Sequence, residues 1–146
     1  IGDVDKLEST VRYELNDAVN KTAHNTGLNL NLAMNYGSRQ EIIMAAKELA
    51  KRTASGDISP EDIDEATFSK MLYTKDIPDP DLLIRTGGDF RISNFLLWQI
   101  AYTELYVTKT YWPEFGKTDL DSAIEEFQSR ERRYGRISEQ IQPNNH

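Results

Sequence analysis

The feature that most constrains this chain is a short apolar run that ends on an arginine and a pair of glycines. Residues 82–84 are β-prone and follow the turn-forming residues 78–80, so the run predicts a buried strand that ends in a glycine turn. Arg85 then emerges at the carboxyl end of this strand, and Gly87 and Gly88 permit unusual backbone dihedrals and close approach of a ligand. In open α/β sheets, ligands bind at such strand ends.

Two arginines and a hydroxyl surround the glycine pair. Arg85 and Arg91 carry planar guanidinium groups that match phosphate oxygens. Ser93 or Asn94 is a candidate N-cap for a helix that we expect to begin near Phe95, and its first amides and dipole would add positive partial charge. We therefore predict a diphosphate site. The alternative is that the arginines pair with acids on a surface loop, namely Asp81, Asp89 or Glu104.

The first half of the chain alternates between helical and extended patterns. Apolar spacing predicts a helix that ends at residues 25–27, and the alternation over residues 28–34 predicts a strand with one apolar face. Ser38 and Glu41 form a capping-box pattern before a predicted helix over residues 39–52. The side chains expected to be buried on that helix are Ile42, Ile43, Ala46 and Leu49.

The second half repeats this alternation. Ser59 and Pro60 predict the start of another helix. The almost wholly apolar residues 94–102 predict a buried helix, and residues 105–108 predict a short strand. A last helix should open at Thr118 and Asp121, with three inward side chains: Leu120, Ile124 and Phe127. Strands that alternate with helices predict an α/β fold, a mainly parallel sheet flanked by helices.

The composition restricts the functional classes. The chain has 146 residues, 38% of them hydrophobic and 28% charged, which agrees with a soluble intracellular domain or part of one, expected in the cytoplasm. A net charge of -7 argues against nucleic acid as a partner. The absence of cysteine excludes disulfides and thiolate chemistry. No apolar run approaches the roughly 20 residues of a membrane span.

Three segments resemble the cis-prenyltransferase family, and most closely its bacterial undecaprenyl diphosphate synthases. Residues 81–115 read DLLIRTGGDFRISNFLLWQIAYTELYVTKTYWPEF, similar to the family's C-terminal signature. Residues 25–42, NTGLNLNLAMNYGSRQEI, resemble its central strand and next helix, and residues 127–135 resemble its closing arginine-rich helix. The resemblance implies that residues 1–146 are the C-terminal portion of a single catalytic domain, with an incomplete cis-prenyltransferase fold.

The family's aspartate-glycine-asparagine loop, which carries its central catalytic aspartate, has no counterpart in this sequence. We therefore expect the catalytic residues to lie in a preceding segment, with none in this chain. The chain alone is then expected to be inactive.

The resemblance implies a transferase reaction and assigns residues to it. Isopentenyl diphosphate would condense with an allylic diphosphate of the farnesyl type, giving a long polyprenyl diphosphate. Undecaprenyl diphosphate, the precursor of the lipid carrier for peptidoglycan synthesis, is an example. The residues that match the family's isopentenyl diphosphate site are Arg85, Arg91, Ile92 and Ser93, and Glu104 matches its acidic Mg²⁺ ligand.

The resemblance also implies a homodimer, with peripheral membrane contact through the product. Two positions depart from the family pattern. Asp89 stands where bacterial members usually have glutamate, and Ser38 replaces a common glycine. Neither departure affects the two arginines.

Two other functions remain as alternatives. Residues 79–81, Asp-Pro-Asp, have the acid-x-acid spacing with which many glycosyltransferases hold a divalent metal. A non-catalytic partner subunit of a heteromeric prenyltransferase is the second alternative. Retention of the arginines, Ser93 and Glu104 together favours the catalytic type, and the end at His146 lacks the Arg-x-Gly terminus of such partners.

Overall fold

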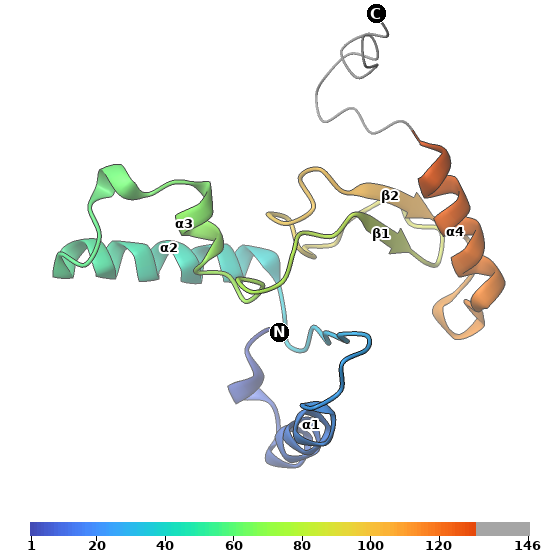
Figure 1. The fold of residues 1–146 in the computed structure, drawn as a ribbon, viewed down its shortest axis with the longest axis horizontal. Helices are drawn as coiled ribbons and strands as arrows, with labels where there is room; N and C mark the ends of the chain where they lie inside the picture. The colour runs from blue at the N-terminus through green and yellow to red at the C-terminus, as the bar shows by residue number, and fades with distance from the viewer. Residues whose placement is uncertain (131–146) are drawn as a thin grey trace, which may run out of the picture. The chain divides into compact units, whose positions relative to one another are not determined.

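The structure, a computed structural model, describes residues 1–130 (Figure 1). The chain forms two units. The first contains Ile1–Pro78 and Ser93–Trp98, and the second contains Asp79–Ile92 and the residues from Gln99 onward. Most of the arginine-rich segment at residues 127–135 lies outside the described residues. Within residues 1–130, no helix has the combined length and apolar character needed to cross a bilayer.

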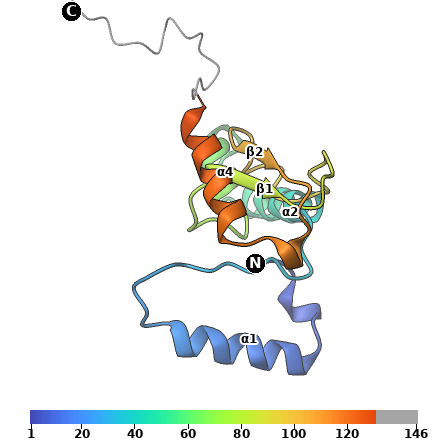
Figure 2. The same ribbon diagram turned by 90° about the vertical axis from the view of Figure 1, so that its right-hand side faces the viewer.

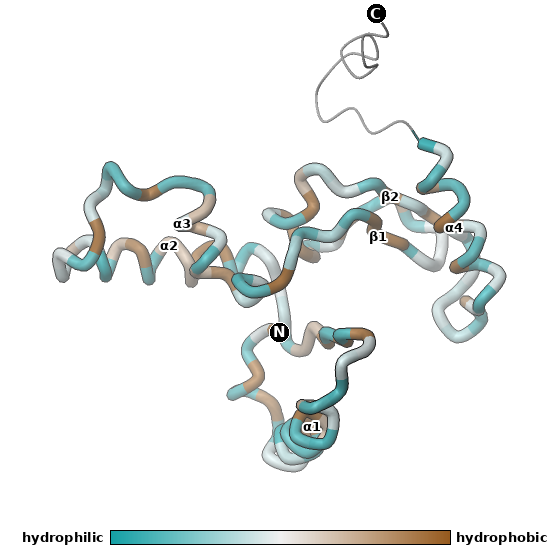
Figure 3. The backbone as a smooth tube through the Cα atoms, in the orientation of Figure 1, coloured by the Kyte–Doolittle hydropathy of each residue, from teal (hydrophilic) through white to brown (hydrophobic). Residues whose placement is uncertain are grey.

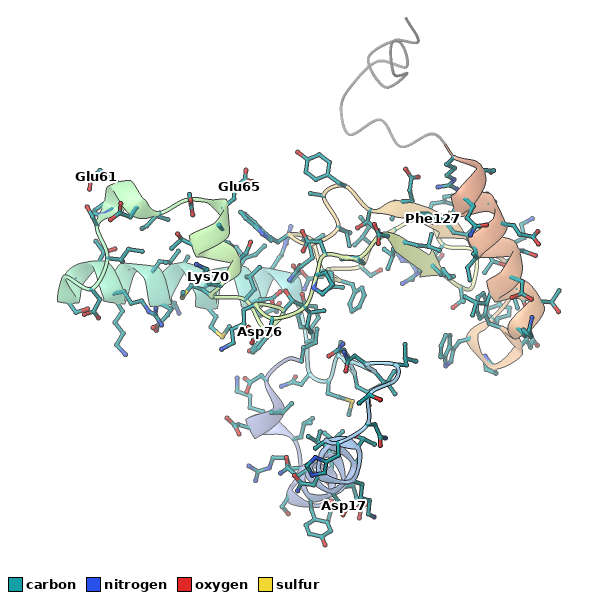
Figure 4. The ribbon with its side chains drawn as sticks, viewed as in Figure 1. Asp17, Glu61, Glu65, Lys70, Asp76 and Phe127 are labelled. Carbon is teal, nitrogen blue, oxygen red and sulfur yellow. The ribbon has the colours of Figure 1, made fainter. Side chains whose placement is uncertain are left out.

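The first unit is helical. Its elements are η1 (Val4–Lys6), α1 (Ser9–Thr22), α2 (Ser38–Ser55), η2 (Pro60–Asp62) and α3 (Glu65–Ser69). The start predicted at Ser59 is only one 3-10 turn, and the α-helix begins after Asp64, whose Oδ1 accepts a 2.7 Å hydrogen bond from the Thr67 amide. The exposed Glu61 and Glu65 side chains point away from α2 (Figure 4).

Helix α2 confirms the predicted helix but buries a different face. Leu49 is buried and Ile42 half-buried as expected, but Ile43 is 56% exposed and Ala46 faces solvent. The buried positions follow one line at a spacing of four: Glu41, Ala45 and Leu49. The periodicity argument failed because it assigned the inward face from apolar residues alone, whereas a buried carboxylate belongs to that face.

Ser38 and Glu41 do not form the predicted capping box. The buried Ser38 Oγ accepts a 2.9 Å hydrogen bond from the Leu97 amide. The buried Glu41 carboxylate accepts hydrogen bonds from the Tyr36 hydroxyl at 2.6 Å and the Tyr73 amide at 2.8 Å. Burial and the bond to Glu41 raise the pKa of Tyr36 to about 12. Both residues therefore make tertiary contacts instead of capping their own helix.

Residues 28–34 form no strand, contrary to the prediction. Figure 2 shows this segment running back along α1 as an irregular loop, and Figure 3 shows polar and apolar positions following one another in it. Within residues 1–130, its backbone bonds reach only the chain start: the Ile1 amino group donates to the Leu32 carbonyl, and the Met34 amide donates to the Ile1 carbonyl. A strand needs a neighbour along its length, and Leu28 is accordingly 93% exposed.

The second unit confirms both predicted short strands. Strands β1 (Leu82–Arg85) and β2 (Glu104–Val107) form a parallel pair, with Leu82 opposite Glu104 and Arg85 opposite Val107. Strand β1 is half-buried and not buried as predicted, since it has one neighbouring strand in the described residues. The unit also contains η3 (Trp112–Glu114) and α4 (Lys117–Ser129), which packs against β2.

Helix α4 begins at Lys117, one residue before the predicted Thr118, and Gly116 is its N-cap. Asp119 Oδ2 accepts a 3.0 Å hydrogen bond from the Gly116 amide, and its Oδ1 accepts one from the Thr110 hydroxyl at 2.9 Å. Of the inward residues, Phe127 is half-buried (Figure 4), whereas Leu120 and Ile124 are exposed. The fully buried residue is the small Ala123.

No helix covers residues 94–102, where a buried helix was predicted. These residues form successive turns, and Ser93, Asn94 and Leu96 have φ of 54°, 63° and 49°. Left-handed non-glycine residues cost about 1–3 kcal/mol each, so this backbone is strained. The helix-dipole contribution expected at Ser93 and Asn94 is therefore absent, although Gln99 and Ile100 are buried as expected for part of the segment.

Candidate functional site

The diglycine turn extends the pairing of the two strands. The Gly87 amide donates to the Thr110 carbonyl at 2.9 Å, and the Gly88 amide donates to the Thr108 carbonyl at 2.8 Å. Both glycines have φ near +80°, at 84° and 78°, which side-chain-bearing residues rarely adopt. Because their amides are already bonded, the glycines shape the loop after Arg85 and are not anion donors.

The two predicted arginines meet at one carboxylate oxygen. Arg85 Nη2 lies 3.6 Å from Asp89 Oδ2, and Arg91 Nη2 lies 2.5 Å from the same atom. The Arg85 side chain is 36% exposed and that of Arg91 is 66% exposed. The alternative of acid pairing is thus observed for Asp89, and the pairing brings both guanidinium groups to a single point.

This arrangement favours replacement of the Asp89 carboxylate by an anion of higher charge. Exposed ion pairs contribute only about 0–1 kcal/mol, so Asp89 holds the arginines weakly. Arg85 Nε is buried and has no hydrogen-bond partner in the described part of the chain. A diphosphate offers more charge and more oxygens than one carboxylate, and it can engage both guanidinium groups.

Glu104 is not brought to the arginine pair. It lies opposite Leu82, at the start of the two-stranded sheet, whereas Arg85 lies at its end. Three residues of strand separate the two levels by about 10 Å. Glu104 Oε2 instead accepts a 2.9 Å hydrogen bond from Arg130 Nη1, which also donates to the Leu105 carbonyl at 2.9 Å.

Arg130 forms a second ion pair with Glu126 through Nη2. The bonds to Glu126 and then to Glu104 raise the pKa of Arg130 above its ordinary value. Sequence reasoning missed this contact, because it considered Glu104 only as a partner of Arg85 or Arg91. The separation of 26 residues between Arg130 and Glu104 carries no sequence signal.

The residues present fit a magnesium ion only in part. Among residues 1–130, no group of three or more acidic or histidine side chains is placed to hold a metal. Glu104 keeps its second oxygen, Oε1, outside the pair with Arg130. Mg²⁺ commonly takes one or two carboxylates together with substrate phosphates, so a single carboxylate oxygen suits a shared site.

Ile92 and Ser93 complete the predicted substrate residues. Ile92 is half-buried and belongs to the second unit with both arginines, and Ser93 is exposed and belongs to the first unit. Within the described residues, the Ser93 hydroxyl has no hydrogen-bond partner. Asn94 beside it, which the sequence offered only as a cap for its own helix, bonds to helix α2: its Oδ1 accepts a 2.8 Å hydrogen bond from the Arg39 amide.

The acid-x-acid segment leads directly into β1. The Pro80 carbonyl accepts a 2.6 Å hydrogen bond from the Thr103 hydroxyl, and the Asp81 carbonyl accepts a 3.0 Å bond from the Glu104 amide. These backbone bonds join the starts of the two strands. The turn thus has a structural role, and it gives no support to a metal-dependent glycosyltransferase.

Comparison with known families assigns this chain to a class. The family model Prenyltransf, described as "Putative undecaprenyl diphosphate synthase", matches residues 1–135. The chain belongs to this family, and hence to the cis-prenyltransferases.

Two similar curated proteins come from bacteria. An isoprenyl transferase of Heliobacterium mobile is 52% identical over 137 residues, which cover 94% of this chain and 53% of the relative. A ditrans,polycis-undecaprenyl-diphosphate synthase of Xanthomonas campestris, (2E,6E)-farnesyl-diphosphate specific, is 50% identical over 141 residues, 97% of this chain and 55% of the relative. The chain thus spans about half the length of the curated relatives it matches.

Two solved structures share the fold. Lavandulyl diphosphate synthase from Lavandula x intermedia, in complex with dimethylallyl diphosphate, matches with a TM-score of 0.88 and 40% identity, covering 92% of this chain and 58% of that one. A probable undecaprenyl diphosphate synthase from Campylobacter jejuni matches with a TM-score of 0.78 and 38% identity, covering 93% and 61%. These matches confirm the mixed helix and parallel-sheet class, and their partial coverage fits an incomplete fold.

Proposed function

We propose that this chain is the C-terminal portion of a catalytic domain that elongates prenyl chains in the cis configuration. The substrates are isopentenyl diphosphate and an allylic diphosphate of the farnesyl type. The product is a long polyprenyl diphosphate such as undecaprenyl diphosphate, which serves as the lipid carrier precursor for cell-wall synthesis. The observation that carries this proposal is the convergence of Arg85 and Arg91 on one oxygen of Asp89, in a member of this family.

The residues of this chain act on the diphosphate of isopentenyl diphosphate. Arg85 and Arg91 exchange their contact with Asp89 for contacts with phosphate oxygens. The two guanidinium groups then neutralise the negative charge of the diphosphate. The Ser93 hydroxyl donates a further hydrogen bond, and the backbone of Ile92 lies beside it in the sequence. The role proposed for each of these residues is substrate binding.

Glu104 contributes to a magnesium site in the complete domain. Its carboxylate oxygen Oε1, which lies outside the pair with Arg130, and the substrate phosphates would hold the ion, which, when bound, would neutralise charge on the departing diphosphate. The remaining ligands and the catalytic aspartate come from a segment that precedes this chain. The isolated chain is therefore inactive as a transferase.

The complete protein acts in the cytoplasm as a homodimer and contacts the membrane peripherally through its apolar product. A non-catalytic partner subunit is the competing assignment. The convergent arginines and the Ser93 hydroxyl, which has no partner within residues 1–130, favour a substrate-binding chain, because a regulatory subunit needs no diphosphate site of its own.

A chimera tests the proposal. The N-terminal portion of the Heliobacterium mobile isoprenyl transferase is fused before Ile1, and incorporation of labelled isopentenyl diphosphate onto farnesyl diphosphate is measured with magnesium. We expect elongation by the chimera, none by the 146-residue chain alone, and loss of at least about tenfold with Arg85→Ala, since hydrogen bonds to charged groups contribute about 1.5–3 kcal/mol.

Two results would contradict the proposal. An inactive but folded chimera that still activates an intact relative when mixed with it would favour the partner subunit. A chimera whose activity is unaffected by Arg85→Ala would remove the assigned diphosphate site.

A further inference from the structure

Asn94 binds the first turn of α2 through both its backbone and its side chain. The Asn94 carbonyl accepts a 2.8 Å hydrogen bond from the Ser38 amide, and its Oδ1 accepts one of 2.8 Å from the Arg39 amide. Its Nδ2 donates to Gln40 Oε1 at 3.2 Å. The free amides at the start of α2 are thus satisfied by a residue more than 50 positions away, and not by a residue just before the helix.

The start of α2 is shaped to receive this side chain. Gly37, the N-cap, has no side chain, and a Cβ there would lie 2.8 Å from Asn94 Nδ2 and 2.4 Å from Gln40 Oε1. Three residues along from Asn94, the Leu97 amide donates to the buried Ser38 Oγ at 2.9 Å. We call these contacts of Asn94 and Leu97 with the first turn of α2 the clasp.

The clasp holds a backbone that would not keep this shape unaided. Ser93, Asn94 and Leu96 all have left-handed φ, between 49° and 63°. Strain of this kind persists only where surrounding contacts impose it, and it gathers at functional sites. Ser93 is the residue just before the clasp, and its exposed hydroxyl has no hydrogen-bond partner within residues 1–130. The strained segment therefore presents a free hydroxyl at a fixed place.

We propose that Asn94 is a positioning residue, which fixes Ser93 against the start of α2 so that the Ser93 hydroxyl meets a phosphate oxygen of isopentenyl diphosphate. The inference rests on the proposed function for the ligand, and on the contacts of the clasp for the mechanism. Asn94 itself does not touch the ligand.

A double-mutant cycle on the full 146-residue chain tests this role. Binding of isopentenyl diphosphate is measured by calorimetry for the parent, Asn94→Gly, Ser93→Ala and the double variant. Glycine tolerates the left-handed φ of residue 94, so Asn94→Gly removes the side chain without adding strain. We expect each single variant to bind about tenfold more weakly, and the double variant to bind no more weakly than Ser93→Ala, because Asn94 acts through Ser93.

Asp64→Ala is the matched control, because Asp64 caps α3 as Asn94 caps α2. It should lower stability without changing affinity. Amide exchange gives a second measurement, in which Asn94→Gly should speed exchange most at Arg39, whose amide loses its acceptor Oδ1, and less at Ser38 and Leu97, whose acceptors remain.

The outcomes separate the two claims. The proposed function stands if the parent binds isopentenyl diphosphate and Arg85→Ala weakens that binding. In that case the positioning role still fails if the effects of Asn94→Gly and Ser93→Ala multiply in the double variant. It also fails if Asp64→Ala weakens binding as much as Asn94→Gly does. If the parent does not bind isopentenyl diphosphate at all, the proposed diphosphate site fails, and the inference fails with it.

Discussion

Glu41 is a buried carboxylate that accepts hydrogen bonds from two tyrosines, Tyr36 and Tyr73. Tyr36→Phe removes the 2.6 Å hydrogen bond to Glu41 from the interior. Since hydrogen bonds to charged groups are worth about 1.5–3 kcal/mol, we expect that loss in the free energy of unfolding at pH 7. Urea denaturation measures it. Tyr73→Phe is the control, because Tyr73 contacts Glu41 through its backbone amide, which the substitution keeps.

The same pair predicts a dependence on alkaline pH. Burial and the bond to Glu41 raise the pKa of Tyr36 from 10.0 to about 12 in the folded state. The corresponding stability is complete below pH 10 and is lost as pH rises from 10 to 12. Stability of the parent should therefore fall more steeply across this window than that of Tyr36→Phe. Equal slopes for the two proteins would contradict the assignment.

At the scale of elements, two adjacent alanines on α2 separate the observed face from the one that periodicity predicts. Ala45 is completely buried, whereas Ala46 is exposed. Ala45→Leu should destabilise the chain by about 1–3 kcal/mol through overpacking. Ala46→Leu should change stability by less than about 0.5 kcal/mol. Thermal unfolding of the two variants measures both effects. A larger loss of stability for Ala46→Leu than for Ala45→Leu would support the buried face predicted from the apolar periodicity.

Helix α4 depends on Asp119 for its start, which gives an acid-side prediction. Hydrogen bonds from the Gly116 amide and then the Thr110 hydroxyl lower the pKa of Asp119 from its ordinary 3.8. Its contribution is present above pH 3.8 and is lost as pH falls further. Asp119→Asn should flatten the fall in stability below pH 4. Asp121→Asn, which removes only a surface pair with Lys117, should leave that fall unchanged.

Some elements of the fold could be predicted from local sequence patterns, whereas others depend on contacts between residues far apart in the chain. Strands β1 and β2 and helices α1, α2 and α4 follow from local patterns. The parallel pairing was predicted from an alternation with helices and is confirmed, although no helix lies between β1 and β2. Residues 28–34 have a strand pattern, but no neighbouring strand is available in the described residues. The turns at residues 94–102 depend on Asn94 and Leu97 bonding to α2, which no local pattern reveals.

The same distinction holds for the site. Arg85 and Arg91 could be chosen from their chemistry and their place around two glycines. Their meeting at Asp89 depends on the loop bonds of Gly87 and Gly88 to the chain after β2, which are long-range contacts. The partner of Glu104 was missed for the same reason, since Arg130 reaches it from the end of α4.

At the scale of the whole molecule, the exposed leucines of residues 28–34 predict self-association. Leu28 is 93% exposed and Leu30 77%, and they line a groove of about 1000 Å³ beside α1. Contiguous exposed apolar surface drives association. Replacing both leucines with serine should lower the apparent mass at high concentration in sedimentation experiments. The free energy of unfolding should change little, because neither side chain is buried. An unchanged mass would show that this surface is inert.

The net charge of -7 sets the electrostatic background for the proposed diphosphate site. A negative molecule repels diphosphate over most of its surface, so any binding has to come from local groups. Two guanidinium groups at one point supply such a local field, and its strength should fall with ionic strength.

The most direct test is calorimetric titration of the chain with inorganic pyrophosphate, for the parent and for Arg85→Ala, Arg91→Ala and Arg52→Ala. Arg52 is a matched control, paired with Glu48 on α2. The account predicts that Arg85→Ala and Arg91→Ala each weaken binding by at least about tenfold, while Arg52→Ala leaves it unchanged. Undiminished binding in both site variants, or an equal loss with Arg52→Ala, would contradict the claim that these two arginines form the diphosphate site.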